Sequence, residues 1–491
     1  MVGEVLSAVF DPRIIAYIFV GVGSGICIGA LPGLTATMGV ALLLPLTFGM
    51  DATSGMLLLL GIYIGAIYGG SISAILLKTP GTPASAATAQ DGYAFSQRGE
   101  GGRALGIATM SSFLGGVVSC TCLILISPQL AKVALKFSAP EFFMLAAFGL
   151  SIIASVSGGS LAKGLSCGCI GLLGAMIGID SITAYSRFTF GNVNLLSGLN
   201  FIPVMIGLFA MSQAFMSIEE ISTVDVVEQR VTSVLPTKED MKKILKIAPV
   251  TGLIGTFIGI VPGAGADIGA FVAFNEAKRV SKYPEKFGTG IADAIAAAEG
   301  GNNGVTGGAM IPMLTLGIPG DATAAIMIGA LTIQGLQPGP MLFTENKVLM
   351  YTIFVGLLLA NAVMLTLGLL GIRLFIKILS IPKTVLTPII MVLCVVGSYA
   401  MNMSLFDVGV MVFFGILGYF LSKLKVPASP AVLGLILGPL AESNFRRALL
   451  MSQGSVFTFV QSPIAMFFAF MTAITLCWPL ITKIKEKMKA A

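Results

Sequence analysis

The sequence contains no histidine, and its absence excludes several kinds of catalytic and metal site. Histidine is the commonest metal ligand and the side chain best suited to proton transfer near neutral pH. A histidine-ligated zinc site and a Ser-His-Asp hydrolase are therefore excluded. Without histidine, an intramembrane enzyme would have to use Asp267 or Asp321 alone, so we expect no enzyme.

Nucleotide and cofactor sites are missing as well. The glycine-rich runs follow no strand, and no G-x-x-x-x-G-K-[ST] motif is present, which argues against ATP hydrolysis. All seven cysteines lie in apolar stretches. The pairs Cys120/Cys122 and Cys167/Cys169 have i,i+2 spacing, which points the two side chains to different faces of a helix. We expect no disulfide, no resident metal and no cofactor beyond a coupling ion, Na⁺ or H⁺.

Charge is also scarce, since only 11% of the 491 residues are charged while 56% are hydrophobic. Soluble globular proteins carry about 25% charged residues. Several apolar runs reach or approach the roughly 20 residues that cross a bilayer core. They are 104–127, 139–157, 349–372, 385–401, 405–421 and 456–481. The chain is therefore predicted to be a multi-pass membrane protein.

The basic residues predict which loops face the cytoplasm. Seven segments hold 21 of the 29 Lys and Arg residues, and by the positive-inside rule these segments are cytoplasmic. They are 95–103, 158–163, 217–247, 278–286, 373–384, 422–426 and the tail after 481. The C-terminus is thus predicted to be cytoplasmic. Because the basic residues sort by side of the membrane, the net charge of +6 does not indicate nucleic-acid binding.

The polar segment 217–247 divides the chain into two halves that resemble each other. Its second part, from Thr237 onward, has the pattern of a capped amphipathic helix at the membrane surface. At an offset of 230, Pro32-Gly33 corresponds to Pro262-Gly263. Further along, Pro80-Gly81 corresponds to Pro319-Gly320. We therefore divide the chain into a first repeat (1–216), a cytoplasmic amphipathic linker (217–247) and a second repeat with C-terminal spans (248–491).

Loop charge indicates that the two repeats are inverted in the membrane. The loop after Pro32-Gly33 carries no basic residue, whereas the loop after Pro262-Gly263 carries four. The contrast reverses after the second Pro-Gly of each half. Segments 14–48 and 248–278 are predicted to be re-entrant hairpins. The expected fold is an all-α polytopic membrane protein with about 11 transmembrane spans, two re-entrant hairpins and an inverted-topology repeat.

The four Pro-Gly interruptions are the predicted binding site. Proline breaks the helical hydrogen-bond ladder, and in lipid such breaks survive only where they face protein or a cavity. Free N–H groups at half-helix N-termini suit a carboxylate, and neighbouring hydroxyl and amide groups add donors. The alternative for each motif is a kink that only shapes a helix. The predicted substrate-binding residues are Gly33, Thr35, Thr37, Lys78, Thr79, Gly81, Thr82, Ser85, Gly263, Asn302, Asn303, Gly320 and Thr323.

Charged residues at membrane depth are costly and usually functional. Lys78 adjoins a Pro-Gly break and is suited to neutralise a substrate carboxylate; the alternative is a lysine that snorkels to the interface. Asp267, Glu299 and Asp321 are the candidates for binding a coupling cation. Each is equally suited to cap a half-helix, and for Asp321 the cap is the stronger interpretation.

Longer motifs resemble one known family. They are residues 30–49, 68–77, 80–85, 202–210, 262–265 and 336–340. These stretches resemble the large membrane subunit of tripartite tricarboxylate transporters (TctA-type), and the resemblance covers most of residues 14–345. It implies an inner-membrane complex with a small membrane subunit and a periplasmic solute-binding protein. Resemblance to elevator-type transporters is looser and rests on the repeat pattern.

Together these observations predict secondary, cation-coupled uptake of di- or tricarboxylate anions such as citrate, delivered by the periplasmic binding protein. Two alternatives remain. The chain is a channel-like membrane subunit permeable to carboxylates, or it takes up another small organic anion.

Overall fold

The computed structural model describes residues 2–156, 161–180, 182–219, 234–379, 381 and 383–490. These residues are almost entirely helical. Their strands are a single antiparallel pair, β1 (Gly178–Ile179) and β2 (Ser186–Arg187). Eight of the described helices are long and apolar enough to cross a membrane, and five shorter apolar helices accompany them. This agrees with the predicted all-α polytopic class, while the number of spans remains a prediction.

The chain forms two compact units, of which unit 1 comprises Met1–Ala131 and Gln213–Met401. All four Pro-Gly interruptions lie in unit 1. Its helices, some of which run past these limits, are α1 (Val2–Val9), α2 (Pro12–Ala30), α3 (Ala36–Leu43), η1 (Leu44–Thr47), α4 (Ala52–Leu77), η2 (Pro83–Ser85), α5 (Ala86–Gln97), α6 (Gly101–Ala134), α10 (Ser212–Glu219), α11 (Lys238–Ile260), α12 (Ala266–Val280), η5 (Pro284–Lys286), α13 (Ala292–Leu316), α14 (Ala322–Ile333), α15 (Leu342–Glu345), α16 (Lys347–Leu370), α17 (Ile372–Ile378) and α18 (Lys383–Asn402).

Close packing of glycine stripes joins α2 to α4. A Cβ atom added at Gly65 would lie 2.3 Å from the carbonyl oxygen of Val22, and one at Gly69 would lie 2.5 Å from that of Ile26. No larger side chain fits at these positions, so the two backbones are in direct contact, as small-xxx-small stripes allow in membrane helices. The apolar stretch of α4 is buried on every face, as expected for a helix that is hydrophobic all round.

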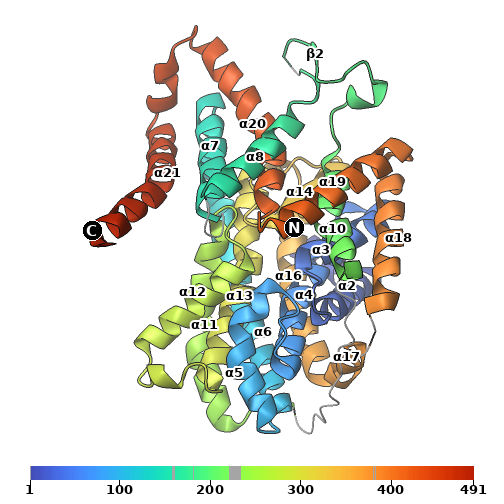
Figure 1. Ribbon diagram of the computed structural model, residues 1–491, viewed down its shortest axis with the longest axis vertical. Helices are drawn as coiled ribbons and strands as arrows, with labels where there is room; N and C mark the ends of the chain where they lie inside the picture. Colours follow the sequence, from blue (N-terminus) through green and yellow to red (C-terminus); the bar gives the residue numbers. More distant parts are fainter. Residues whose placement is uncertain are drawn as a thin grey trace. The chain divides into compact units, whose positions relative to one another are not determined.

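The helices α11 and α13 lie side by side (Figure 1) and pack through the corresponding positions. A Cβ added at Gly304 would lie 2.4 Å from Gly252 O, and one at Gly308 would lie 2.4 Å from Thr256 O. Gly252 and Thr256 follow Val22 and Ile26 by 230 positions. Gly304 and Gly308 follow Gly65 and Gly69 by 239 positions. The same two offsets therefore relate both the sequence motifs and the contacts between backbones.

Each predicted interruption separates two helices. We name them in chain order: the first break (31–35), the second break (78–82), the third break (261–265) and the fourth break (317–321). Gly33 and Gly263 have positive φ angles of 95° and 81°. The helices before the second and fourth breaks end in left-handed residues, Lys78 and Gly317. The first and third breaks thus share one kind of turn, and the second and fourth share another.

The helical part of the predicted linker differs from expectation. Residues 220–233 of the linker lie outside the described part of the chain, as do 158–160 of the predicted basic loop 158–163. The expected cap is present, because Thr237 Oγ1 accepts from Asp240 N at 3.2 Å and Asp240 Oδ2 accepts from Thr237 N at 2.9 Å. The helix that starts there continues to Ile260 as α11 and does not end near 247. Proline inside a helix removes one donor and crowds the preceding turn, yet α11 continues through Pro249 and packs along α13.

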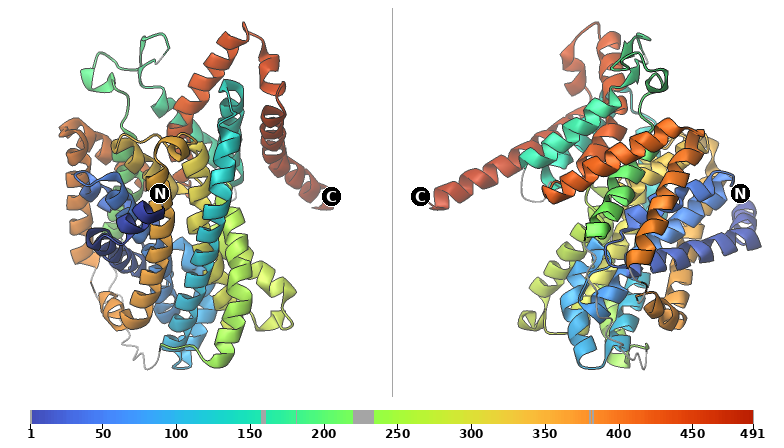
Figure 2. Two further views of the ribbon diagram at one scale, coloured as in Figure 1. Left: turned by 180° about the vertical axis from the view of Figure 1, so that it is seen from behind. Right: turned by 45° about the vertical axis from the view of Figure 1, so that its right-hand side comes forward.

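Unit 2 comprises Lys132–Ser212 and Asn402–Ala491. Figure 2 shows two of its helices, α20 and α21, as an open V. Its other described elements include the β1–β2 pair. Its helices are α7 (Ala139–Val156), α8 (Leu161–Ala175), η3 (Val193–Leu195), α9 (Phe201–Met205), the π-helix η4 (Ile206–Met211), α19 (Leu405–Lys423), α20 (Ser429–Met451), η6 (Val456–Val460) and α21 (Pro463–Ala490).

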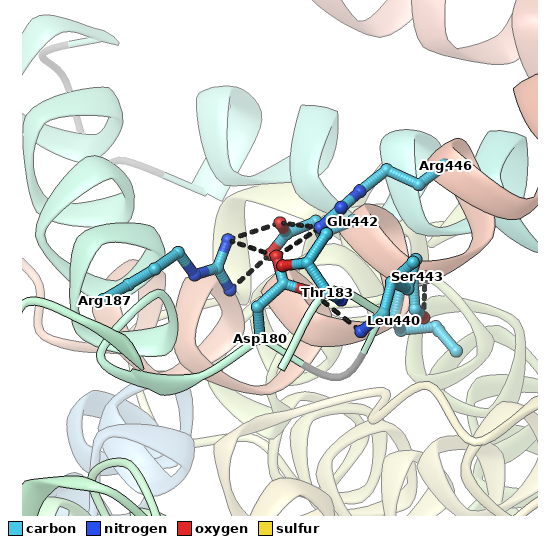
Figure 3. A network of polar contacts seen from close by, with 8 residues as sticks. Asp180, Thr183, Arg187, Leu440, Glu442, Ser443 and Arg446 are labelled. Carbon is cyan, nitrogen blue, oxygen red and sulfur yellow. Dashed lines mark hydrogen bonds and ion pairs between the residues drawn. The ribbon is translucent and has the colours of Figure 1, made fainter. Parts of the chain in front are cut away.

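An ion-pair network in unit 2 ties the loop that contains β1 and β2 to α20 (Figure 3). Asp180 Oδ2 accepts from Arg446 at 2.5 Å, and Arg187 donates to both carboxylate oxygens of Glu442 at 2.6 and 3.1 Å. The Arg446 guanidinium, with backbone donors from the loop itself, holds the pKa of Asp180 below its usual range. The network fixes this loop but contains none of the predicted binding residues.

Candidate functional site

A buried carboxylate lies at the centre of the site. Glu299, on α13, is 0% exposed. Its Oε1 accepts from Ser71 Oγ and Thr88 Oγ1, each at 2.5 Å, and its Oε2 accepts from Ser112 Oγ at 2.8 Å. Asn302 Nδ2 lies 3.4 Å from Oε2. The donors come from α4, α5, α6 and α13, so this one side chain connects four helices.

The second break lies beside this carboxylate, because Thr88 belongs to the first turn of the helix that follows the break. Asn302 Nδ2 also lies 3.5 Å from Ala84 O in η2. A Cβ at Gly81 would lie 2.0 Å from Gly29 O, at the end of α2, and Gly81 N donates to Gly70 O at 3.1 Å. The glycine at this break is therefore required for a close approach between chain segments.

Two polar atoms near the second break are buried and have no hydrogen-bond partner in the described part of the chain. They are Thr82 Oγ1 and Asn303 Oδ1. The rest of the local polar groups are paired: Ser85 Oγ donates to Thr82 O at 2.8 Å, and Asn303 Nδ2 donates to Asn302 Oδ1 at 3.0 Å. Buried polar atoms without partners are uncommon in folded proteins, and a ligand is one explanation for them.

The fourth break is organised around Asp321. Its Oδ1 accepts from Ala324 N at 2.7 Å, which makes it the N-cap of α14, and its Oδ2 accepts from Tyr63 OH at 2.5 Å. Tyr63 is completely buried on α4. Thr323 Oγ1 lies 3.0 Å from Thr37 Oγ1 in α3. Residues from the first half of the chain therefore complete the break of the second half.

The third break joins the same region. Gly263 N donates to Gly320 O at 2.7 Å, which connects the third break to the fourth. Asp267, in the first turn of α12, is exposed, and it is close enough to Asp321 and Tyr63 to interact with them electrostatically. Two carboxylates thus lie near the fourth break, one buried and one accessible.

Several predicted residues do not join these contacts. Lys78 and Thr79 are exposed. The Lys78 ammonium lies 5.7 Å from the centre of the Tyr93 ring, and Thr79 Oγ1 donates to its neighbour Leu77 O at 3.4 Å. Thr35 caps α3 by accepting from Met38 N at 3.1 Å. Gly33 is also exposed, so the structure places the first break at the margin of the cluster.

Four residues that the sequence reasoning missed complete the site: Ser71, Thr88, Ser112 and Tyr63. Ser71 lies within the stretch 68–77, one of the motifs that carry the family resemblance. Tyr63 is a polar residue in an otherwise apolar run. Thr88 and Ser112 carry no local signal, because hydroxyl residues are common in membrane helices and only tertiary contacts distinguish these two.

The described residues contain no group of three His, Cys, Asp or Glu side chains arranged to hold a metal ion. The oxygens around Glu299 are instead one carboxylate and three hydroxyls. Such oxygens are typical ligands for hard cations.

One protein-family model and two relatives match this chain. The model of the family described as "Tripartite tricarboxylate transporter TctA family" matches residues 15–433. A protein of Agrobacterium vitis described as "Uncharacterized 52.8 kDa protein in TAR-I ttuC' 3'region" is 38% identical over 454 residues, covering 92% of this chain and 90% of that relative. A second protein of the same organism, "Uncharacterized protein in TAR-II ttuC' 3'region", is 37% identical over 211 residues, which cover 43% of this chain and 87% of that relative. No solved structure matches.

Proposed function

Because the chain belongs to the tripartite tricarboxylate transporter TctA family, we propose that it carries di- or tricarboxylate anions into the cell by cation-coupled secondary transport. The family makes it a membrane component of a tripartite transporter. The observation that carries the finer proposal is that residues at three Pro-Gly breaks meet. Thr37, just after the first break, contacts Thr323, just after the fourth, and so joins the two halves, while Gly263 of the third break donates to Gly320 of the fourth.

The second break is the proposed anion site. It directly precedes η2 and α5, and the positive end of the helix dipole favours negative charge there. Thr82 Oγ1 is buried without a partner in the described residues, and a hydroxyl can donate to a carboxylate. Asn302 and Asn303 supply amide groups beside it. Lys78 and Thr79, which are exposed, are left out of this proposed site.

The two halves are proposed to be inverted repeats that move as in elevator-type transporters. The shared offsets of 230 and 239 in both motifs and packing support a repeat, and the opposite charges of corresponding loops support its inversion. In such an arrangement, two related sets of broken helices meet near mid-membrane, where a substrate and its coupling ion can bind together.

The proposed assembly places the chain in the inner membrane with a cytoplasmic C-terminus. The family implies partner subunits. We propose that these are a small membrane subunit and a periplasmic binding protein that delivers the anion. The basic tail after residue 481 supports the cytoplasmic placement of the C-terminus.

Uptake into proteoliposomes tests this function. The full chain is reconstituted with the small membrane subunit, and labelled citrate is supplied with the binding protein. We expect saturable accumulation against the citrate gradient when an inward Na⁺ or H⁺ gradient is imposed. Equilibration of citrate down its gradient alone would indicate a channel. Uptake that is independent of both cation gradients would contradict the coupling.

A further inference from the structure

Glu299 differs from the other two candidate carboxylates because it is buried without capping a helix. Asp321 caps α14 and binds Tyr63, while Asp267 is exposed. Glu299 lies inside α13, beyond its first turn, where no helix end needs a cap, and it is completely buried. No ion pair to Lys or Arg is recorded for it among the described residues. A buried carboxylate of this kind needs an opposite charge or several donors.

The three hydroxyls around Glu299 are unusual for helical serine and threonine. Such hydroxyls usually donate to the carbonyl three or four residues earlier, as Ser119 and Thr109 do here. Ser71, Thr88 and Ser112 instead have Glu299 as their recorded partner. On three helices, a hydroxyl therefore donates to the Glu299 carboxylate and not to a carbonyl of its own helix.

These oxygen atoms are suitable ligands for an alkali cation. A hydroxyl that donates to the carboxylate in one state can rotate and present its lone pairs to a cation in another. One carboxylate supplies a single negative charge, which balances a monovalent ion. Ca²⁺ sites take six to eight oxygen ligands, and Mg²⁺ keeps several waters and demands octahedral geometry. The donor set therefore favours a monovalent ion.

We propose that Glu299, Ser71, Thr88 and Ser112 form a Na⁺ site. This deepens the proposed function and rests on its cation coupling, since it names the ion and selects one of three candidate carboxylates. The site lies between α4, α5, α6 and α13. Asn302 lies within reach of both Glu299 and the backbone of Ala84, so an ion here would order the second break, where the anion is proposed to bind.

Thermal unfolding of the purified full-length chain tests the site without substrate. Samples in detergent contain NaCl or choline chloride at equal ionic strength. At a Na⁺ concentration near 100 times Kd, we expect Na⁺ to raise the Tm of the unmodified protein by about 3 °C or more. Glu299→Gln should remove the shift, because the amide keeps the shape of the side chain but not its charge.

A neighbouring pair of serines provides the matched control. Ser112→Ala removes one proposed ligand and should weaken Na⁺ binding about tenfold. Ser111 is equally buried in the same helix, and its Oγ has no recorded partner in the described chain. Ser111→Ala should therefore show the unmodified Na⁺ response. This comparison remains decisive even if Glu299→Gln fails to fold.

The outcomes separate this proposal from the proposed function. Equal loss in both serine variants, or a full Na⁺ shift in Glu299→Gln, would overturn the site. No Na⁺ shift in the unmodified protein, with uptake driven by a proton gradient alone, would also overturn it and leave carboxylate uptake intact. A Na⁺ shift that follows Ser112 and Glu299, without carboxylate uptake under any gradient, would support the site and contradict the transport proposal.

Discussion

The two glycine-packed helix pairs of unit 1 share one backbone arrangement but carry different chemistry. In both pairs, the same positions bring main chains into contact, as with Gly65 on Val22 and Gly304 on Gly252. The polar residues at corresponding positions are unlike. Glu299 of α13 corresponds to Leu60 of α4. Close packing is thus common to both halves, whereas a buried carboxylate at this position is present only in the second half.

The second and fourth breaks likewise share a backbone pattern but differ in their side chains. The residues that follow Pro-Gly in the second and fourth breaks are Thr82 and Asp321, one neutral and one acidic. Tyr63 and Asn302 also correspond, and each reaches across to the break of the opposite half: Tyr63 to Asp321, and Asn302 to Ala84 O. Matched frameworks with unmatched side chains suit a site that must hold an anion and a cation at once.

The largest effect is expected at the glycines of the second and fourth breaks. A Cβ at Gly81 would lie 2.0 Å from Gly29 O, and one at Gly320 would lie 2.4 Å from Gly259 O. Gly81→Ala and Gly320→Ala should each abolish uptake while membrane insertion persists, because backbone must shift, at a cost of about 1–3 kcal/mol or more. Gly49→Ala, whose Cβ meets open space, is the control. Normal uptake in either break variant would remove the breaks from the site.

An intermediate effect is expected at the cap of the fourth break. Asp321→Ala removes the N-cap, worth about 1 kcal/mol, and leaves the buried Tyr63 hydroxyl unpaired at about 1–3 kcal/mol. Asp321→Thr copies the residue of the second break and should recover part of that loss. Thermal unfolding measures both variants, and both should keep the stabilisation by Na⁺. Loss of the Na⁺ response in Asp321→Thr would assign the ion to the fourth break instead.

The smallest effect is expected at the left-handed residue before each break. Lys78 has a φ of 58°, and its counterpart is Gly317. Lys78→Gly should stabilise the chain by about 1 kcal/mol, because a non-glycine residue is strained in this conformation. The exposed position of Lys78 predicts an unchanged KM for citrate uptake. A large rise in KM, with Lys78→Arg retaining normal KM, would bring the lysine into the anion site.

The sequence revealed the parts of the site that have local signatures. Pro-Gly pairs predicted all four breaks, and the cap pattern after Thr237 predicted the start of α11. The partners of Glu299 could not be predicted, because Ser71, Thr88 and Ser112 come from three helices and meet only through tertiary packing. The exposure of Lys78 could not be predicted either, because it also depends on tertiary packing. Local chemistry predicts where a helix breaks, but not which distant hydroxyl lies beside it.

A cross-link between Thr37 and Thr323 tests most directly whether breaks from the two halves form one transport site. Their hydroxyl oxygens lie 3.0 Å apart, close enough for cysteines there to form a disulfide with small adjustment. Thr37→Cys and Thr323→Cys are combined in a chain whose seven native cysteines are replaced by alanine. Uptake into proteoliposomes is then measured before oxidation, after oxidation and after reduction, with each single variant as control. We expect oxidation to stop uptake in the double variant alone and reduction to restore it, whereas full uptake by the cross-linked chain would contradict a transport site built from these breaks.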